Sequence, residues 1–119
     1  MKSLKLSGKI EHKRLREIFT ENVDENECYR EYIFLSNETM IATGSRYMFR
    51  TGDYVGFIMI SHYDGQYQII DFGRVGGGKG IMNLRLGAGN TWEKNMMDKL
   101  KEEAQKSGFN SEELGDIKS

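Results

Sequence analysis

The sequence predicts an α+β domain in which an antiparallel sheet of five or six strands packs against two helices, in the order β-α-β-β-β-β-(β)-α. Two segments with helical spacing of apolar residues enclose a long stretch in which apolar residues alternate with polar ones. Turn signals interrupt that stretch, and they use Gly, Asn and Asp because the chain has 14 glycines and no proline. The 119 residues fit one domain, expected over residues 1–109, followed by a polar C-terminal tail over 110–119.

The chain begins with an expected strand and an expected helix. Apolar residues alternate with polar ones from Leu4 to Ile10, and Gly8 is a candidate bulge. From Glu11 the period changes, because apolar side chains then fall three and four residues apart. The residues of this helical stripe are Leu15, Ile18, Phe19 and Val23.

Four expected strands follow as a meander. They cover Tyr29–Ser36, Thr39–Arg50, Tyr54–Tyr63 and Gln66–Val75. The last two are separated by Asp64-Gly65, a strong short-range signal for a two-residue hairpin. This hairpin would place Tyr63 opposite Gln66.

The hairpin register assigns side chains to the two faces of the sheet. It pairs Met59 with Ile70 and Phe57 with Phe72, on the face expected to meet the helices. It places Asp71 opposite Ile58 on the other face. A strand carboxylate there is ordinarily exposed to solvent, but a covering partner would raise its pKa and make it a candidate functional group.

The last third of the chain predicts a further strand and a second helix. Residues 82–86 alternate again, which favours a sixth strand. Asn90-Thr91-Trp92-Glu93 has the form of a capping box and begins a helical stripe. Gly108 followed by Phe109 is typical of a Schellman stop.

Two apolar surfaces are candidate contact sites. The first is the cleft between the sheet and the second helix, where the same residues would equally serve as ordinary core: Phe57, Met59, Ile70, Phe72 and Trp92. The second is the opposite face of the sheet, which is unusually apolar for a surface that meets only water. Its candidate interface residues are Tyr54, Ile58, Ile60 and Ile69, with Val75 beside them. The glycine-rich segment, a symmetric partner chain or a small apolar ligand would cover this face.

A glycine-rich segment over residues 73–80 is the candidate anion site. It matches the phosphate-binding pattern G-x-x-x-x-G-K up to its last position, where Gly80 replaces the Ser or Thr that would hold magnesium. It also precedes an expected strand rather than a helix, so the sequence does not favour a nucleotide hydrolase. Consecutive backbone N–H groups beside cations can still hold an anion. The candidate residues are Arg74, Gly76, Gly77, Gly78, Lys79, Gly80 and Arg85.

Charge and composition narrow the function classes. With 17 basic and 18 acidic residues the formal charge is −1, which does not favour nucleic-acid binding, for which Tyr29, Arg46, Tyr47 and Arg50 would be the candidates. The chain has no apolar run long enough for a membrane span and no apolar core of a signal peptide near Met1. The lone Cys28 cannot form an internal disulfide. We therefore expect a cytosolic protein with no membrane contact.

Metal and nucleophile chemistry have little support in the sequence. His12, His62 and Cys28 are the only soft metal ligands, and their spacing predicts no chelating site. No Ser or Cys stands in a nucleophile-elbow pattern. No cofactor and no catalytic residue are predicted.

The element order resembles the helix-grip and TATA-binding-protein-like folds, in which a curved antiparallel sheet wraps a long C-terminal helix. The closing segment, Gly76-Gly77-Gly78-Lys79-Gly80, then Leu84-Arg85-Leu86-Gly87-Ala88-Gly89 and a capped helix, looks like a small bacterial protein family of unknown function. This second resemblance covers about the last third of the chain and implies an uncharacterised bacterial cytosolic protein. Helix-grip families often bind apolar ligands between sheet and helix, which the first resemblance implies here.

These observations rank two functions. The first is a non-catalytic module that binds a small apolar ligand or another protein, with a homodimer through the sheet face as one form of it. The alternative is a phosphate or nucleotide binder, or a small enzyme, that uses residues 73–80.

Overall fold

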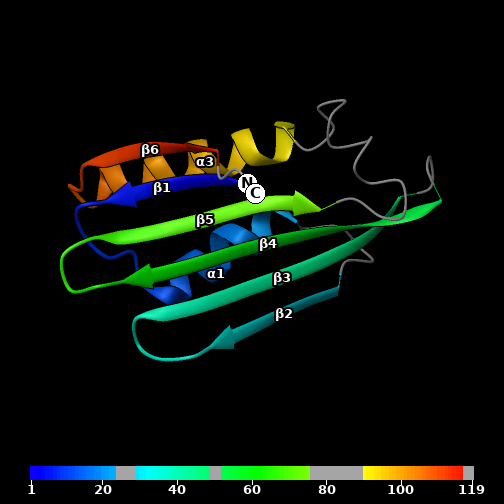
Figure 1. Ribbon diagram of the computed structural model, residues 1–119, viewed down its shortest axis with the longest axis horizontal. Helices are drawn as coiled ribbons and strands as arrows, with labels where there is room; N and C mark the ends of the chain where they lie inside the picture. The colour runs from blue at the N-terminus through cyan, green and yellow to red at the C-terminus, as the bar shows by residue number, and fades with distance from the viewer. Residues whose placement is uncertain (24–28, 49–51, 76–89, 117–119) are drawn as a thin grey trace.

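The sheet contains six described strands in the order β2-β3-β4-β5-β1-β6, and every neighbouring pair is antiparallel (Figure 1). The computed structural model describes residues 1–23, 29–48, 52–75 and 90–116. The elements are β1 (Lys2–Leu6), α1 (His12–Asn22), β2 (Tyr29–Phe34), β3 (Thr39–Met48), β4 (Asp53–Tyr63), β5 (Gln68–Val75), α3 (Asn90–Lys106) and β6 (Ser111–Asp116). The predicted α+β class is confirmed.

Both helices lie on the same face of the sheet (Figure 1). α1 packs on β3 and α3 packs on β5 and β1, and the two helices also contact each other. The core between the layers contains most of the apolar stripes that the sequence predicts, including Leu15, Ile18 and Phe19 from α1 and Met96 and Leu100 from α3. The other face of the sheet carries no helix among the described residues.

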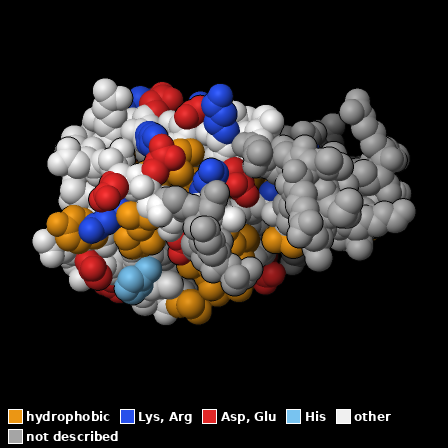
Figure 2. Space-filling view, turned by 45° about the horizontal axis from the view of Figure 1, so that its top comes forward, with side chains coloured by type: hydrophobic (Ala, Val, Ile, Leu, Met, Phe, Trp, Pro, Cys, Tyr) orange, Lys and Arg blue, Asp and Glu red, His pale blue; other side chains and the backbone are white. Residues whose placement is uncertain are grey.

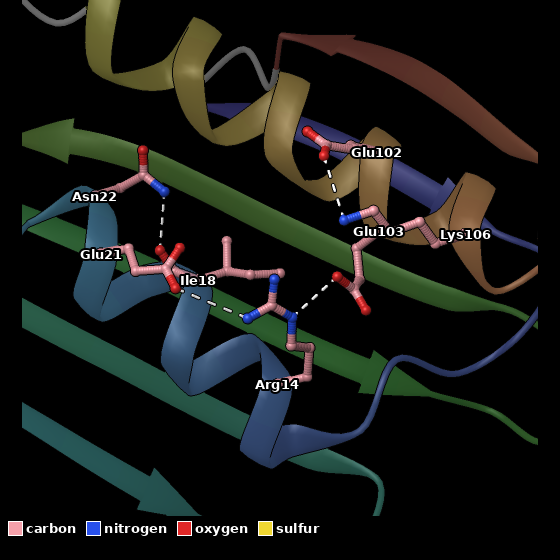
Figure 3. A network of polar contacts seen from close by, with 7 residues as sticks. All are labelled: Arg14, Ile18, Glu21, Asn22, Glu102, Glu103 and Lys106. Carbon is pink, nitrogen blue, oxygen red and sulfur yellow. Dashed lines mark hydrogen bonds and ion pairs between the residues drawn. The ribbon is translucent and has the colours of Figure 1, made fainter.

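Polar contacts join the helices at their outer edge (Figure 3). Arg14 of α1 donates from Nε to Glu103 of α3 at 2.9 Å, and its Nη1 lies 3.8 Å from Glu21. The hydrogen bond to Glu103 raises the pKa of Arg14 above its ordinary value. Because these groups are partly exposed, the ion pairs add little stability and mainly orient the two helices.

Strand β1 lies between β5 and β6 although it is remote from both in the sequence. Leu4 and Leu6 are fully buried and face Ile70 and Gln68 across the β1–β5 pair. Gln68 is also fully buried. Its Oε1 accepts from the backbone N–H of Ile10 at 2.8 Å, and its Nε2 donates to the carbonyl of Ile10 at 3.1 Å and to Ser61 Oγ at 2.9 Å. This amide thereby ties the segment between β1 and α1 to β5.

The β4–β5 hairpin exists, but its predicted register is wrong by two residues. Tyr63 faces Gln68, Met59 faces Phe72 and Phe57 faces Arg74. The loop is longer because Asp64 Oδ1 accepts from the backbone N–H groups of Gln66 and Tyr67, at 2.9 and 2.8 Å. A shift of two residues preserves the side-chain faces, so the predicted core set still points toward the helices.

The C-terminal segment differs from the expected polar tail, because Ser111–Asp116 forms the edge strand β6 on β1. Its side chains are polar and exposed as predicted, and its place in the sheet comes from backbone pairing, which side-chain periodicity does not report. Lys101 of α3 forms an ion pair with Glu113 of this strand. The sixth strand predicted over residues 82–86 lies outside the described residues.

The Schellman stop of α3 is confirmed. Gly108 has φ +78°, Phe109 donates its N–H to the carbonyl of Ala104 at 2.8 Å, and Gly108 donates to Gln105 at 3.1 Å. The ring of Phe109 then lies over Gly8, where an added Cβ would stand 2.4 Å from a ring carbon. The proposed bulge at Gly8 is therefore better described as a close approach of this ring.

Replacing Gln68 by Leu should lower the free energy of unfolding by about 2–4 kcal/mol, because it leaves the buried N–H and carbonyl of Ile10 without the amide. Urea unfolding of the variant measures this. Gln66→Leu, at an exposed hairpin position, is the control and should change stability by no more than about 0.5 kcal/mol. Equal effects of the two substitutions would contradict the role of the Gln68 amide.

Replacing Gly8 by Ala should destabilise the protein by about 1–3 kcal/mol, because the new methyl group overlaps the ring of Phe109. The same substitution in a Phe109→Ala background should cost much less. A double-mutant cycle measured by thermal unfolding tests the coupling. Additive effects would show that the ring is not the cause.

The stability contributed by Asp64 should depend on pH. Hydrogen bonds from the N–H groups of Tyr67 and Gln66 lower the pKa of Asp64 below its ordinary value of 3.8. A carboxyl group with a lowered folded pKa stabilises the fold above its unfolded pKa and loses this contribution as the pH falls through the folded pKa. The stability difference between the wild type and Asp64→Ala should therefore be constant near neutral pH and shrink below pH 3.8. A difference that stays constant through the acid range would refute this.

Candidate functional site

The five residues predicted for a ligand cleft lie in the packed core between the sheet and the helices. Met59, Ile70 and Phe72 are fully buried, Phe57 is 3% exposed and Trp92 is 8% exposed. The ring of Trp92 contacts those of Phe57, Phe72 and Phe19 at centroid separations of 5.0, 6.4 and 6.2 Å. Its indole N–H donates to the carbonyl of Asn22 at 3.1 Å. These side chains fill the space at their own positions, as a core does.

The four predicted interface residues share the other, uncovered face of the sheet. Ile58 and Ile60 alternate on β4 with buried core residues, and Ile69 lies on the same face of β5. All three are half-buried, while Tyr54, near the start of β4, is 65% exposed. We call this surface, with its further residues Ile33, Ile41 and Val75, the open face.

The open face extends across more strands than the sequence analysis predicted. Ile33 of β2 faces Ile41 of β3, and Ile41 faces Ile60 of β4, so three isoleucines form one cross-strand row. Ile33 is 41% exposed and Val75, at the end of β5, is 55% exposed. Sequence reasoning missed Ile33 and Ile41 because their membership depends on the register of β2 and β3. Figure 2 shows apolar side chains gathered on the sheet side of the molecule, below charged side chains along the α3–β6 edge.

Asp71 lies at the β5 end of that isoleucine row. It faces Ile60 on one side and Ser3 of β1 on the other, rather than Ile58 as predicted, because of the longer hairpin loop. The carboxylate accepts a hydrogen bond from Ser3 Oγ. A hydroxyl partner and partial burial explain how an acid is tolerated beside the apolar row.

Charged residues lie on both sides of the open face. Glu31 of β2 points to it from one margin, opposite Thr43 of β3. Lys5 of β1 points to it from the other, opposite Ile69 and Glu112, with its ammonium 4.1 Å from the ring centroid of Tyr67. The face therefore has an apolar centre, an acidic margin on β2 and a basic residue near its other margin.

Only Arg74 of the predicted anion site lies in the described part of the chain, and Gly76, Gly77, Gly78, Lys79, Gly80 and Arg85 lie outside it. Arg74 is half-buried on the helix side of β5. Its backbone N–H donates to Glu93 Oε1 of α3 at 3.4 Å, so the acid of the predicted capping box contacts β5. Burial and the neighbouring guanidinium of Arg46 lower the pKa of Arg74.

The two histidines lie in different surroundings. His62 Nδ1 is 2.8 Å from Thr39 Oγ1 on the open-face side, and the ring of His12 contacts that of Phe34 at a centroid distance of 5.8 Å. Burial lowers the pKa of His12. Within the described residues, His, Cys, Asp and Glu side chains form no group of three that could hold a metal ion.

Neither described helix combines the length and apolar character needed to cross a membrane. No family model, curated protein or solved structure matches the chain. The resemblances to the helix-grip folds and to a bacterial family therefore stay predictions, and functional inference rests on the chain's own geometry.

Proposed function

We propose that this protein is a non-catalytic interaction module whose open face associates with a second copy of the chain. The observation that carries the proposal is the row Ile33–Ile41–Ile60, flanked by Ile58 and Ile69, on the face that the described helices leave uncovered. Monomeric proteins rarely expose a large contiguous apolar surface, and such a surface commonly marks a protein contact.

The chemistry of the open face supports binding rather than catalysis. The side chains at its centre are aliphatic, and aliphatic groups neither transfer protons nor act as nucleophiles. Removing them from water stabilises an association by roughly 25 cal/mol for each Å² of apolar surface buried. The paired Ser3 and Asp71 lie at one end of the row, where they can remain hydrogen-bonded when the apolar centre is covered.

A second copy is the partner favoured by the distribution of charge. Two sheets that pack face to face keep their strands within about 30° of each other. When the two-fold axis runs along the strands, β2 of one copy lies over the β1 side of the other. Glu31 of each copy then approaches the side that carries Lys5, so the charged margins are complementary.

Sedimentation velocity over a range of concentrations tests the proposal. The wild type should sediment with twice the 13.7 kDa monomer mass at high concentration. Ile60→Lys should shift it to monomer, because burying an ammonium group at the centre of the interface is costly. Gln105→Lys, which adds the same charge at an exposed position of α3, is the matched control and should remain dimeric.

Circular dichroism should show that the Ile60→Lys variant remains folded, since a long side chain at this half-buried position can extend its charged end into water. Ile41→Thr, a milder change on the same row, should weaken the dimer without abolishing it. A wild type that stays monomeric at every concentration would refute the proposal, as would equal dimerisation of all variants.

A further inference from the structure

Three arginines lie on the helix-covered face of the sheet, at the end where β5 finishes and α3 begins. Arg30 of β2 faces Gly44 of β3, Gly44 faces Phe57 of β4, and Phe57 faces Arg74 of β5. These four residues form one cross-strand row with an arginine at each end. Gly44 contributes no side chain, so the row has space between Arg30 and the ring of Phe57.

Arg46 lies diagonally between the two ends of this row. It stands two residues beyond Gly44 on β3, on the same face, and is paired with the buried Val55. Its guanidinium carbon is 5.6 Å from the centroid of the Phe57 ring. It is also close enough to Arg74 for their charges to repel, which contributes to the lowered pKa of Arg74. All three arginines are half-buried, so their charges are screened less than those on an open surface.

The first turn of α3 lies against this cluster. The ring of Trp92 is 5.0 Å from that of Phe57, and Glu93 accepts the backbone N–H of Arg74. A helix of 17 residues has a partial positive charge at its N-terminus, which adds to the field of the guanidinium groups. In the described part of this cluster, Glu93 brings one carboxylate against three arginines.

We propose that Arg30, Arg46 and Arg74 form a binding site for a small molecule that carries two linked phosphate groups. Clustered, partly desolvated like charges cost free energy, and an anion between them recovers it through charge-assisted hydrogen bonds. Each guanidinium has five N–H donors, so it can hold a ligand oxygen in addition to a neighbouring group of the protein.

The spacing favours two phosphates over one. β3 and β5 are separated by one strand, so the backbones that carry Arg46 and Arg74 lie about 10 Å apart across the sheet. A diphosphate can contact guanidinium groups on both sides of such a gap, whereas a single phosphate is shorter. The site lies at one end of the layer between sheet and helices, which suits a small ligand better than an extended nucleic acid. It is on the opposite face of the sheet from the open face and does not depend on the proposed dimer.

Isothermal titration of the full chain with inorganic pyrophosphate tests the site, with sodium chloride at equal ionic strength as the blank. Wild type should bind pyrophosphate and should melt at a higher temperature in its presence. Arg46→Gln and Arg74→Gln should each weaken binding by about tenfold or more, because each removes a charged fork. Lys99→Gln removes a charge from an exposed position of α3 and should bind like wild type.

Two further measurements decide between explanations. Orthophosphate should bind about tenfold more weakly than pyrophosphate, and equal affinities would overturn the two-phosphate assignment. Arg46→Lys keeps the charge but loses the bidentate geometry, so a folded variant with weakened binding supports the site even if Arg46→Gln fails to fold. No heat of binding and no broadening of the pyrophosphate phosphorus resonance with wild type would overturn the proposal, since the arginines would then serve the fold alone.

Discussion

The insertion of β1 between β5 and β6 is the constraint on which the rest of the structure depends. β1 supplies the two fully buried leucines that face Ile70 and Gln68, and it provides the backbone on which β6 pairs. Gln68 extends the constraint by holding both backbone groups of Ile10, the point where the chain leaves β1 for α1. A buried amide with all these partners is specific in a way that apolar packing is not, because any displacement leaves polar groups unsatisfied.

This arrangement divides the sheet into two unlike faces. Because α1 and α3 both pack on one side, the aromatic cluster around Trp92 is enclosed, and the isoleucines on the other side have no described helix over them. The two faces therefore suit different roles. The covered face supplies the core, with an arginine cluster at one end, while the open face presents an apolar centre between charged margins.

Much of the fold could be predicted from local patterns in the sequence. The stripe of Leu15, Ile18 and Phe19 predicted α1, and the alternation on β4 and β5 predicted which residues face the helices. The Gly108 stop was also predicted, because a positive φ favours glycine strongly. The hairpin register was wrong because the Asp64 side chain captures two backbone N–H groups and lengthens the loop. The polar β6 was missed because edge-strand pairing uses backbone groups, which every sequence carries.

The sequence by itself determined the α+β class, the two helices, the faces of the central strands and the apolar character of Ile58, Ile60 and Ile69. Only the tertiary structure decided that Ile33 and Ile41 join these residues, that Ser3 meets Asp71, and that Arg30 and Arg46 lie near Arg74. The physical reason is that periodicity reports which side of its own element a residue occupies. Strand order and register, which no local pattern encodes, decide which residues from distant segments become neighbours.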